Sequence, residues 1–336
     1  MEAPSSPEPQ KSARPERREP RPAHAKGSHP HQKPQAPQVP QVPQVKVFLE
    51  GRYRKLCRDL PQTVFFCPDC KGHPRRRRGC ARCEGFGKLT RDSVQELIGW
   101  VVGAAFKTRK NVFHGAGRED VNVRMLGGGR PFVMELVAPK QHDVDLAAVE
   151  AEINRRNTGR LEVVGLHWTE KTRVRAVKEA KHAKEYRALV VVRSTPDSVR
   201  STPDSVPAAP SLERVTPLVG ARTIVVQHTP ERVAHRRADL DRERWIELLS
   251  VESAPAGEDG LPRLEVKLRT QHGTYVKEAI SGEGGSTRPS LSELVGAPCE
   301  CVELDVIEIL DEEGKAAEDA PARPASPPVW AANLDD

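Results

Sequence analysis

Aromatic residues and long apolar runs are both scarce in this chain. Only 4% of the 336 residues are aromatic, and no uninterrupted apolar stretch approaches the ~18–20 residues that a membrane-spanning helix needs. The N-terminal region is basic and rich in proline but has no apolar core, which argues against a secretory signal. We therefore expect a cytoplasmic protein with no membrane partner.

The charge balance favours a polyanionic partner without identifying one. Charged residues make up 30% of the chain, the formal net charge is +6 and the isoelectric point is near 9.0. A diffuse positive excess of this size also occurs in proteins that bind no nucleic acid. Composition alone therefore raises the expectation of RNA binding only modestly.

Both ends of the chain are poor in core-forming residues. Residues 1–45 contain 11 prolines, and residues 312–336 are similar in kind. We expect both segments to be disordered tails, because neither can bury enough apolar surface to offset its chain entropy.

A short tandem repeat interrupts the middle of the chain. Residues 193–199 are repeated without change at 200–206. A packed element could not absorb such an insertion, so we predict a flexible surface loop over 194–212.

Four of the seven cysteines stand in two Cys-x-x-Cys pairs, which are Cys67 with Cys70 and Cys80 with Cys83. Two intervening residues let both thiolates of a pair reach one ion, and the glycines after each pair permit the turns that this needs. Nine residues separate the pairs, enough for a hairpin, although this spacer is shorter than in many zinc ribbons. We predict a structural Zn²⁺ in a small hairpin module over residues 46–91; a site that has lost its metal is the alternative.

Four consecutive arginines occupy the predicted tip of this hairpin: Arg75, Arg76, Arg77 and Arg78. On a rigid loop they could bind phosphates, so they are candidate substrate-binding residues; a solvated turn is the alternative. The cysteine spacing is also similar to that of the cysteine-rich modules of DnaJ-type chaperones. Those modules normally carry four such repeats, and no J-domain precedes this pair.

The region between the tails has a mixed helix and strand pattern. Apolar residues recur at helical spacing over Ser93–Phe106, and Tyr186–Val192 is rich in strand-forming residues. Val121–Leu126 and Pro131–Val137 are expected to be two strands joined as a hairpin by Gly127–Arg130. This alternation predicts an α+β fold, in which an antiparallel or mixed sheet has helices packed on one side.

The loop Gly115–Asp120 lies between that helix and the first strand of that hairpin, and its glycines precede the triplet Arg118, Glu119 and Asp120. Such a loop, followed directly by a strand, can present side chains into a cleft. On residue chemistry alone, a charged triplet in a loop is most often a solvated surface turn.

Residues 113–121 read Phe-His-Gly-Ala-Gly-Arg-Glu-Asp-Val, which resembles the catalytic motif of pseudouridine synthases, whose common form is Gly-Arg-x-Asp. The chain is most similar to the archaeal and eukaryotic tRNA pseudouridine(54/55) synthase family, and the similarity spans about Tyr53 to Leu310. The predicted zinc hairpin also occupies the place that this family gives one. Further matches follow in order at Arg124–Gly127, Gly129–Phe132, Lys184–Val190, Gly273–Glu278, Pro289–Gly296 and Leu304–Ile307.

The resemblance implies a pseudouridine-synthase catalytic fold over residues 92–311, with a mixed, largely antiparallel sheet flanked by helices. It also implies an isomerase acting on tRNA in the TΨC arm, at position 55 and with 54 as a second candidate. Because the sequence has no apolar heptads, we expect a monomer. This reaction breaks the N1–C1′ bond of uridine and joins C5 to C1′ without redox change or energy input, so no organic cofactor is needed. In agreement, the sequence has neither a phosphate-binding loop nor a dinucleotide-binding fingerprint.

The resemblance also implies roles for individual residues. Asp120 corresponds to the catalytic carboxylate, which acts as a nucleophile at sugar or base or takes a ribose proton. Lys277 supplies the cation that keeps this carboxylate ionised, where related families often carry arginine. Tyr186 matches the active-site tyrosine that packs on the uracil and helps to move the C5 proton. Arg118 takes up space or phosphate when the uridine leaves the stack.

Three departures from the family pattern are present; the first two remove no catalytic group, and the third bears on substrate position. Asn122 stands where an acidic residue is usual, and His272 where a small residue is usual. The family also carries an N-terminal RNA-binding domain of the THUMP type, whereas only the proline-rich tail and residues 46–66 precede the first cysteine pair here. Docking of tRNA is then expected to depend on Arg75–Arg78, Lys181–Lys184 and His235–Arg237. A catalytically weak, zinc-containing RNA-binding or chaperone-like protein is the alternative function.

Overall fold

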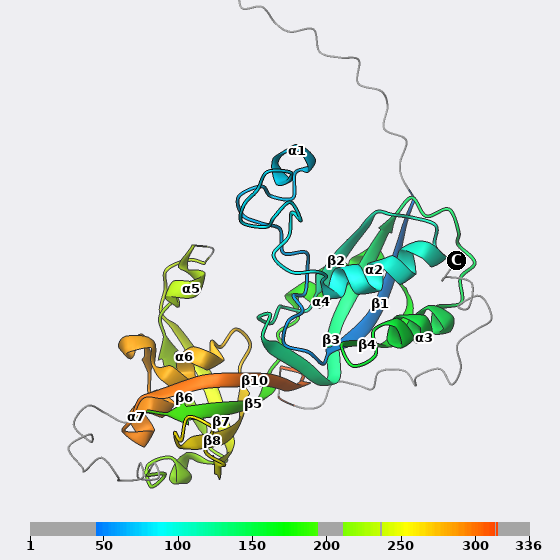
Figure 1. The fold of residues 1–336 in the computed structure, drawn as a ribbon. Helices are drawn as coiled ribbons and strands as arrows, with labels where there is room; N and C mark the ends of the chain where they lie inside the picture. The colour runs from blue at the N-terminus through cyan, green and yellow to red at the C-terminus, as the bar shows by residue number, and fades with distance from the viewer. Residues whose placement is uncertain (1–44, 194–210, 236, 313, 315–336) are drawn as a thin grey trace, which may run out of the picture. The chain divides into compact units, whose positions relative to one another are not determined.

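The computed structural model describes residues 45–193, 211–235, 237–312 and 314 (Figure 1). The predicted tails and the predicted loop over 194–212 lie almost entirely outside these residues. No helix in the described part of the chain is long and apolar enough to cross a membrane.

One sheet of ten strands organises the described residues, in the order β4-β1-β3-β10-β5-β8-β7-β6-β9, with β2 paired to β3 as well (Figure 1). Every pairing is antiparallel except that between β3 (Val123–Val137) and β10 (Cys299–Ile309), which run parallel. The mixed, largely antiparallel sheet expected from the sequence is therefore confirmed. The other strands are β1 (Lys46–Lys55), β2 (Asn111–Gly115), β4 (Leu161–Thr169), β5 (Lys184–Val192), β6 (Arg222–Gln227), β7 (Arg242–Ala254), β8 (Arg263–Thr270) and β9 (Thr287–Arg288).

Helices cover both faces of the sheet around β3. Successive side chains of a strand point to opposite faces, and Phe132 and Met134 of β3 accordingly pack in the main core with helices α2 (Val94–Ala105) and α3 (Leu146–Arg156). Val133, which lies between them, packs on the other face against α4 (Lys171–Glu179). The flanking helices implied by the resemblance are thus present, whereas the expectation of helices on one side alone is wrong, because β3 buries apolar side chains on both faces.

Local sequence signals explain where the helices begin. The helix expected over Ser93–Phe106 is α2, and the Ser93 hydroxyl caps it by accepting a hydrogen bond from the Glu96 amide at 3.2 Å. Near the end of the chain, α7 (Leu291–Val295) begins with a capping box formed by Ser290 and Glu293. The remaining short helices are α1 (Pro74–Arg77), α5 (Glu231–Ala234) and α6 (Val276–Ser281), with single 3₁₀ turns at Thr216–Leu218 and Glu283–Gly285.

The hairpin expected around Gly127–Arg130 is wrong, because β3 continues through these residues as one strand of 15 residues. Gly127 has a φ of +54°, and a Cβ at this position would lie 2.0 Å from the carbonyl oxygen of Ile307 in β10. The glycines therefore permit a close crossing of two strands rather than a reversal of the chain.

Residues 46–55 also depart from expectation. They were assigned to the hairpin module, but they form β1, which pairs with β3 and β4 in the sheet. The cysteine pairs themselves follow β1 and flank the short helix α1 (Figure 1). The strand lies in the sheet because its apolar residues, such as Leu49 and Tyr53, are fully buried there.

A single carboxylate lies where β3 and β10 meet. Asp305 in β10 is almost fully buried and forms ion pairs with Arg58 at 2.7 Å, Arg124 at 2.7 Å and Arg187 at 3.0 Å. These arginines come from the segment after β1, from β3 and from β5, so the carboxylate connects distant parts of the chain at the only parallel strand pair of the described sheet.

Candidate active site and metal site

The loop Gly115–Asp120, here called the acid loop, connects β2 to β3 and is fixed from one side by a buried lysine. Lys55 is fully buried, and its Nζ donates to the carbonyl oxygens of Asp120 at 3.0 Å, Val121 at 2.9 Å and Leu60 at 2.9 Å. Burial lowers the pKa of Lys55. Three carbonyl acceptors compensate part of the desolvation of this cation, and in return the cation fixes the loop backbone at Asp120.

Glu119 points from the acid loop into the core beneath the cleft. Its carboxylate accepts a hydrogen bond from the Tyr53 hydroxyl at 2.8 Å and forms an ion pair with Arg130 at 2.7 Å. The side chains of Glu119 and Arg130 are each only 1% exposed. Burial, together with the Glu119 charge, raises the pKa of Tyr53 well above its usual value. Arg130 also donates to the Ala116 carbonyl at 2.7 Å, so this buried pair supports the loop from within.

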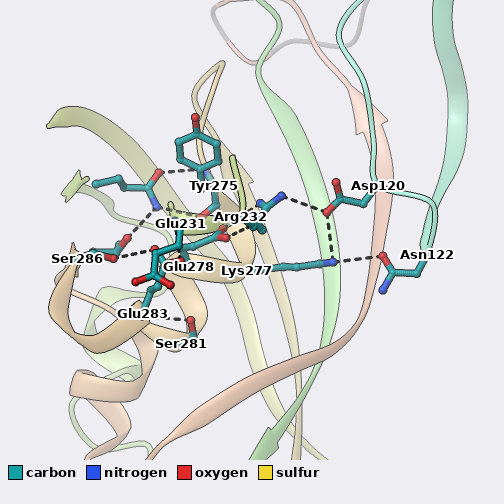
Figure 2. A network of polar contacts seen from close by, with 12 residues as sticks. Asp120, Asn122, Glu231, Arg232, Tyr275, Lys277, Glu278, Ser281, Glu283 and Ser286 are labelled. Carbon is teal, nitrogen blue, oxygen red and sulfur yellow. Dashed lines mark hydrogen bonds and ion pairs between the residues drawn. The ribbon is translucent and has the colours of Figure 1, made fainter. Parts of the chain in front are cut away.

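Asp120 points the opposite way, toward solvent and toward two cations. Its Oδ2 lies 3.3 Å from Lys277 Nζ and 3.4 Å from Arg232 Nη1, as Figure 2 shows. The Asp120 side chain is 41% exposed, which leaves room for a ligand at the second carboxylate oxygen. Lys277 also donates to the Asn122 side-chain oxygen at 3.2 Å. Because Asn122 is neutral, it orients the ammonium without competing for its charge.

Arg232 in α5 has its own anchor. Its Nε lies 2.5 Å from Glu278 Oε1 in α6, and this hydrogen bond is the main cause that raises the pKa of Arg232 (Figure 2). The Arg232 guanidinium also lies 5.9 Å from the centre of the Tyr275 ring. Glu278 is buried, so it holds Arg232 in place while the other end of the guanidinium faces Asp120.

Asp120, Lys277, Arg118 and Tyr186 all line one cleft, whose cavity volume is about 470 Å³. Tyr186 is half-buried there, and burial raises its pKa to about 12, so its phenol is neutral near pH 7. Lys184, two residues earlier on β5, lines the same cleft, and burial lowers its pKa to about 8. The four residues that the sequence analysis assigned to catalysis or base binding are thus brought together.

The cleft is strongly basic. Two acidic side chains, Glu119 and Asp120, line it among the described residues, and Glu119 is neutralised by Arg130. Such a surface suits a polyanionic ligand. Eight basic side chains line it: Arg118, Arg130, Lys184, Arg232, Arg237, Arg242, Arg244 and Lys277.

Arg75–Arg78 do not line this cleft. They are exposed in α1 and at its end, between the two cysteine pairs. Their contact with substrate stays a prediction. Sequence reasoning assigned no role to Lys55, Arg130 or Arg232. Arg130 stood inside a matched family segment, whereas the partners of Lys55 are backbone carbonyls and those of Arg232 lie 46 and 112 residues away.

The four paired cysteines converge on one point. Their Sγ atoms all lie within 4.8 Å of one another, with Cys67 to Cys80 at 3.7 Å and Cys70 to Cys83 at 3.6 Å. Four thiolates at about 2.3 Å from a tetrahedral ion would be separated by about 3.8 Å, so the two measured separations suit Zn²⁺. The amide of Gly87 donates to Cys83 Sγ at 3.1 Å, as around thiolate ligands. The cluster could therefore hold a metal ion.

The described fold and site thus combine a mixed sheet with an acidic loop residue in a basic cleft, an arrangement that suits a polyanionic ligand. A model of the protein family described as "Pus10, C-terminal" matches residues 48–310, and the chain belongs to this family. The resemblance found in the sequence is thereby confirmed.

Several relatives carry the name tRNA pseudouridine synthase Pus10. The protein from Methanopyrus kandleri is 44% identical over 271 residues, which cover 80% of this chain and 57% of the relative. The protein from Methanothrix thermoacetophila is 43% identical over 263 residues, or 78% and 53% of the two chains. The protein from Korarchaeum cryptofilum is 41% identical over 268 residues, or 79% and 66%. The chain thus spans between about half and two thirds of the length of these curated relatives.

Proposed function

We propose that this chain is a tRNA pseudouridine synthase that uses Asp120 as its catalytic carboxylate. The observation that carries the proposal is the position of Asp120 in a basic cleft, with Lys277 Nζ 3.3 Å from its carboxylate and Tyr186 lining the same cleft. Relatives at 41–44% identity named tRNA pseudouridine synthase support tRNA as the substrate.

The reaction is an isomerisation that balances without a cofactor. The N1–C1′ bond breaks, the uracil rotates, a C5–C1′ bond forms, C5 loses a proton and N1 gains one. Asp120 either attacks the sugar or the base or takes a ribose proton. In each case it must be ionised when the base fills the cleft, and the adjacent charges of Lys277 and Arg232 offset the cost of removing water from it.

Tyr186 provides the surface on which the uracil packs. With a pKa of about 12 its hydroxyl stays protonated near pH 7, so it stacks and donates a hydrogen bond. For it to receive the C5 proton, its own proton must first leave. Arg118, on the acid loop and in the cleft, takes the space or a phosphate of the displaced uridine.

The finer assignments rest on the family resemblance. We infer the TΨC arm as the target, at position 55 and with 54 as a second candidate, and action as a monomer in the cytoplasm. Cys67, Cys70, Cys80 and Cys83 would hold a structural Zn²⁺, which closes its coordination with four thiolates and supplies no chemistry to the uridine. Its place is to fix the turn that presents Arg75–Arg78 to RNA.

One assay tests the reaction. The full chain is incubated with an unmodified tRNA transcript, and pseudouridine is mapped along the RNA for wild type and for Asp120→Asn. Pseudouridine in the TΨC arm from wild type alone supports the proposal. Activity that persists in Asp120→Asn overturns the role of Asp120. No pseudouridine from wild type on any tRNA favours the RNA-binding or chaperone-like alternative.

Metal analysis tests the cysteine site independently. Purified protein is expected to contain one zinc per chain, and Cys67→Ser with Cys83→Ser to contain none. Protein without zinc, after purification in zinc-containing buffer, would contradict the Zn²⁺ assignment.

A further inference from the structure

A second basic surface, which shares no lining residue with the cleft, lies beside the C-terminal half of α2. This α2 groove has a cavity volume of about 1190 Å³ and is bounded by α2, the turn that follows it, the first residue of β2 and the segment after β3. Trp100 projects from α2 into it with 56% of its surface exposed. An indole exposed to this extent offers a flat apolar face on which a ligand can stack.

Four exposed cations surround this indole: Lys107, Arg109, Lys110 and Lys140. None of them forms a side-chain hydrogen bond or an ion pair within the part of the chain that the structure describes. The one acidic residue of the groove, Glu96, is already paired with Lys88 at 2.7 Å. By contrast, the surface cations Arg54 of β1 and Arg173 of α4 have carboxylate partners. The groove therefore presents uncompensated positive charge.

The backbone that carries these cations is fixed. The Thr108 amide donates to the Gly103 carbonyl at 2.9 Å, and the Thr108 hydroxyl to the Val137 carbonyl at 2.7 Å. The Lys140 amide donates to the carbonyl of Phe106, which is fully buried. At Gly103 an added Cβ would lie 2.7 Å from the Thr108 carbonyl oxygen, so the turn folds closely back on α2. Binding would order side-chain ends rather than the loop itself.

We propose that the α2 groove binds an unpaired segment of the RNA substrate, with one base stacked on Trp100 and its flanking phosphates on Lys107, Arg109, Lys110 and Lys140. An exposed aromatic ring among unpaired cations is the pattern by which proteins bind single-stranded nucleic acid. The proposal rests on the proposed function for the identity of the RNA. The geometry suits it, because β2 starts in the groove at Asn111 and ends at the acid loop, on the order of 15 Å further along the strand.

Binding of a fluorescein-labelled octauridylate and of a whole tRNA transcript to the full chain tests the proposal by fluorescence anisotropy. Trp100→Ala is expected to weaken octauridylate binding about 10-fold, and Trp100→Phe by much less, because phenylalanine keeps a stacking face. Arg109→Glu with Lys110→Glu is expected to weaken it more than 10-fold. The slope of log affinity against log salt should also fall by about 1.4, for two lost phosphate contacts on a single strand.

A matched control distinguishes RNA binding at the α2 groove from non-specific attraction by the net charge of the protein. Lys171→Glu with Lys178→Glu makes the same change in net charge on α4, which covers the opposite face of the sheet. This variant is expected to keep octauridylate affinity within about twofold and to keep the quenching of Trp100 fluorescence by RNA. Equal losses in both double variants would overturn the proposal, as would unchanged binding in Trp100→Ala. Arg109 and Lys110 are both exposed, so the variant Arg109→Glu with Lys110→Glu should have the same melting temperature as wild type. This variant therefore still tests the proposal if Trp100→Ala fails to fold.

The outcomes are distinguishable from those for the reaction. Trp100-dependent octauridylate binding without any pseudouridine formation would sustain the groove and overturn the proposed function. Pseudouridine formation with the same KM for tRNA in wild type and in both groove variants would overturn the groove alone. Self-association that is lost in Trp100→Ala, with RNA binding unchanged, would assign the groove to a second copy of the chain and also overturn it.

Discussion

The two carboxylates of the acid loop are neighbours in sequence and opposite in environment. Glu119 points into the core, where its side chain is 1% exposed and paired with Arg130, whereas Asp120 is 41% exposed and contacts Lys277 in the cleft. The inner side of the loop is thus neutralised and closed to ligands. The outer side has a carboxylate whose cations come from α5 and α6, far away in the chain.

This difference separates two tasks that one Arg-Glu-Asp triplet performs. The buried pair fixes the loop to the sheet, at the expense of removing two charges from water. The exposed acid remains available because its neighbour and Lys55 hold the backbone beneath it. A loop that is rigid on one side can thus present a reactive group on the other, as catalytic constellations require.

The largest expected effect lies on the outer side. Asp120→Asn should lower the rate of pseudouridine formation by at least about 10³-fold, because the amide can neither attack nor accept a proton. Its thermal unfolding should differ little from wild type, since partly exposed ion pairs contribute about 0–1 kcal/mol. Single-turnover kinetics and a thermal melt measure the two quantities. An Asp120→Asn variant that is inactive because it has unfolded would contradict the distinction between Asp120, which serves the reaction, and Glu119, which serves stability.

The next effect lies on the inner side. Glu119→Gln should lower the free energy of unfolding by about 3–5 kcal/mol, because it leaves the Arg130 charge buried without a counterion. Denaturant titration measures this loss. Glu119→Gln combined with Arg130→Met should recover part of it, since the unpaired charge is then gone. A Glu119→Gln variant as stable as wild type would show that the inner pair does not support the loop.

The local parts of this comparison were predictable from the sequence and the long-range parts were not. Asp120, Tyr186 and Lys277 could be selected because each stands in a short motif, and Ser93 because a helix cap is a local signal. Arg232 lies 112 residues from Asp120, and its ion pair with Glu278 of α6 holds it there. The role of Lys55 could not be predicted, because its partners are backbone carbonyls and every residue has one.

The errors have the same origin. Three consecutive glycines predict a turn when only neighbours in sequence are considered. In the structure, Gly127 and Gly129 instead allow β10 and β1 to pass close to β3. A Cβ added at Gly129 would lie only 2.8 Å from the Tyr53 carbonyl oxygen. Strand pairing across such separations leaves no periodic trace in the chain, so β1 was likewise assigned to the wrong unit.

A third prediction compares the two cations of Asp120. Lys277→Met should lower the rate of pseudouridine formation about 10²-fold, because Lys277 lies closest to the carboxylate and supplies a preorganised charge. Lys277→Arg should retain most of the activity, since it keeps the charge. Arg232→Met should cost less in rate and more in stability, because it also leaves the buried Glu278 unpaired. Equal effects of Lys277→Met and Lys277→Arg would show that shape rather than charge matters here.

The smallest effect concerns Lys184, whose folded-state pKa of about 8 lies below the unfolded value of about 10.4. Between these pH values the unfolded chain holds a proton that the folded chain has lost, so stability rises with pH. The gain should be roughly 1–3 kcal/mol between pH 8 and pH 10.4, and Lys184→Met should abolish it. Denaturant titrations across this range, with Lys171→Met as the exposed control, would show the difference. An identical pH dependence in Lys184→Met and wild type would contradict the burial effect.

The meeting of β3 and β10 has a consequence for how this protein reaches its active form. Asp305 joins arginines that precede it by 118 to 247 positions, and it does so beside the strands that separate Asp120 from Lys277. Contacts between such distant segments close late, because each requires a long chain loop to be ordered first. We therefore expect Lys277, 157 residues along the chain, to reach Asp120 late in folding, so that a partly folded chain would carry an acid loop without this counter-charge. Recovery of activity during refolding would then lag behind recovery of the circular-dichroism signal of the helices. That interval would measure how long β3 and β10 take to pair.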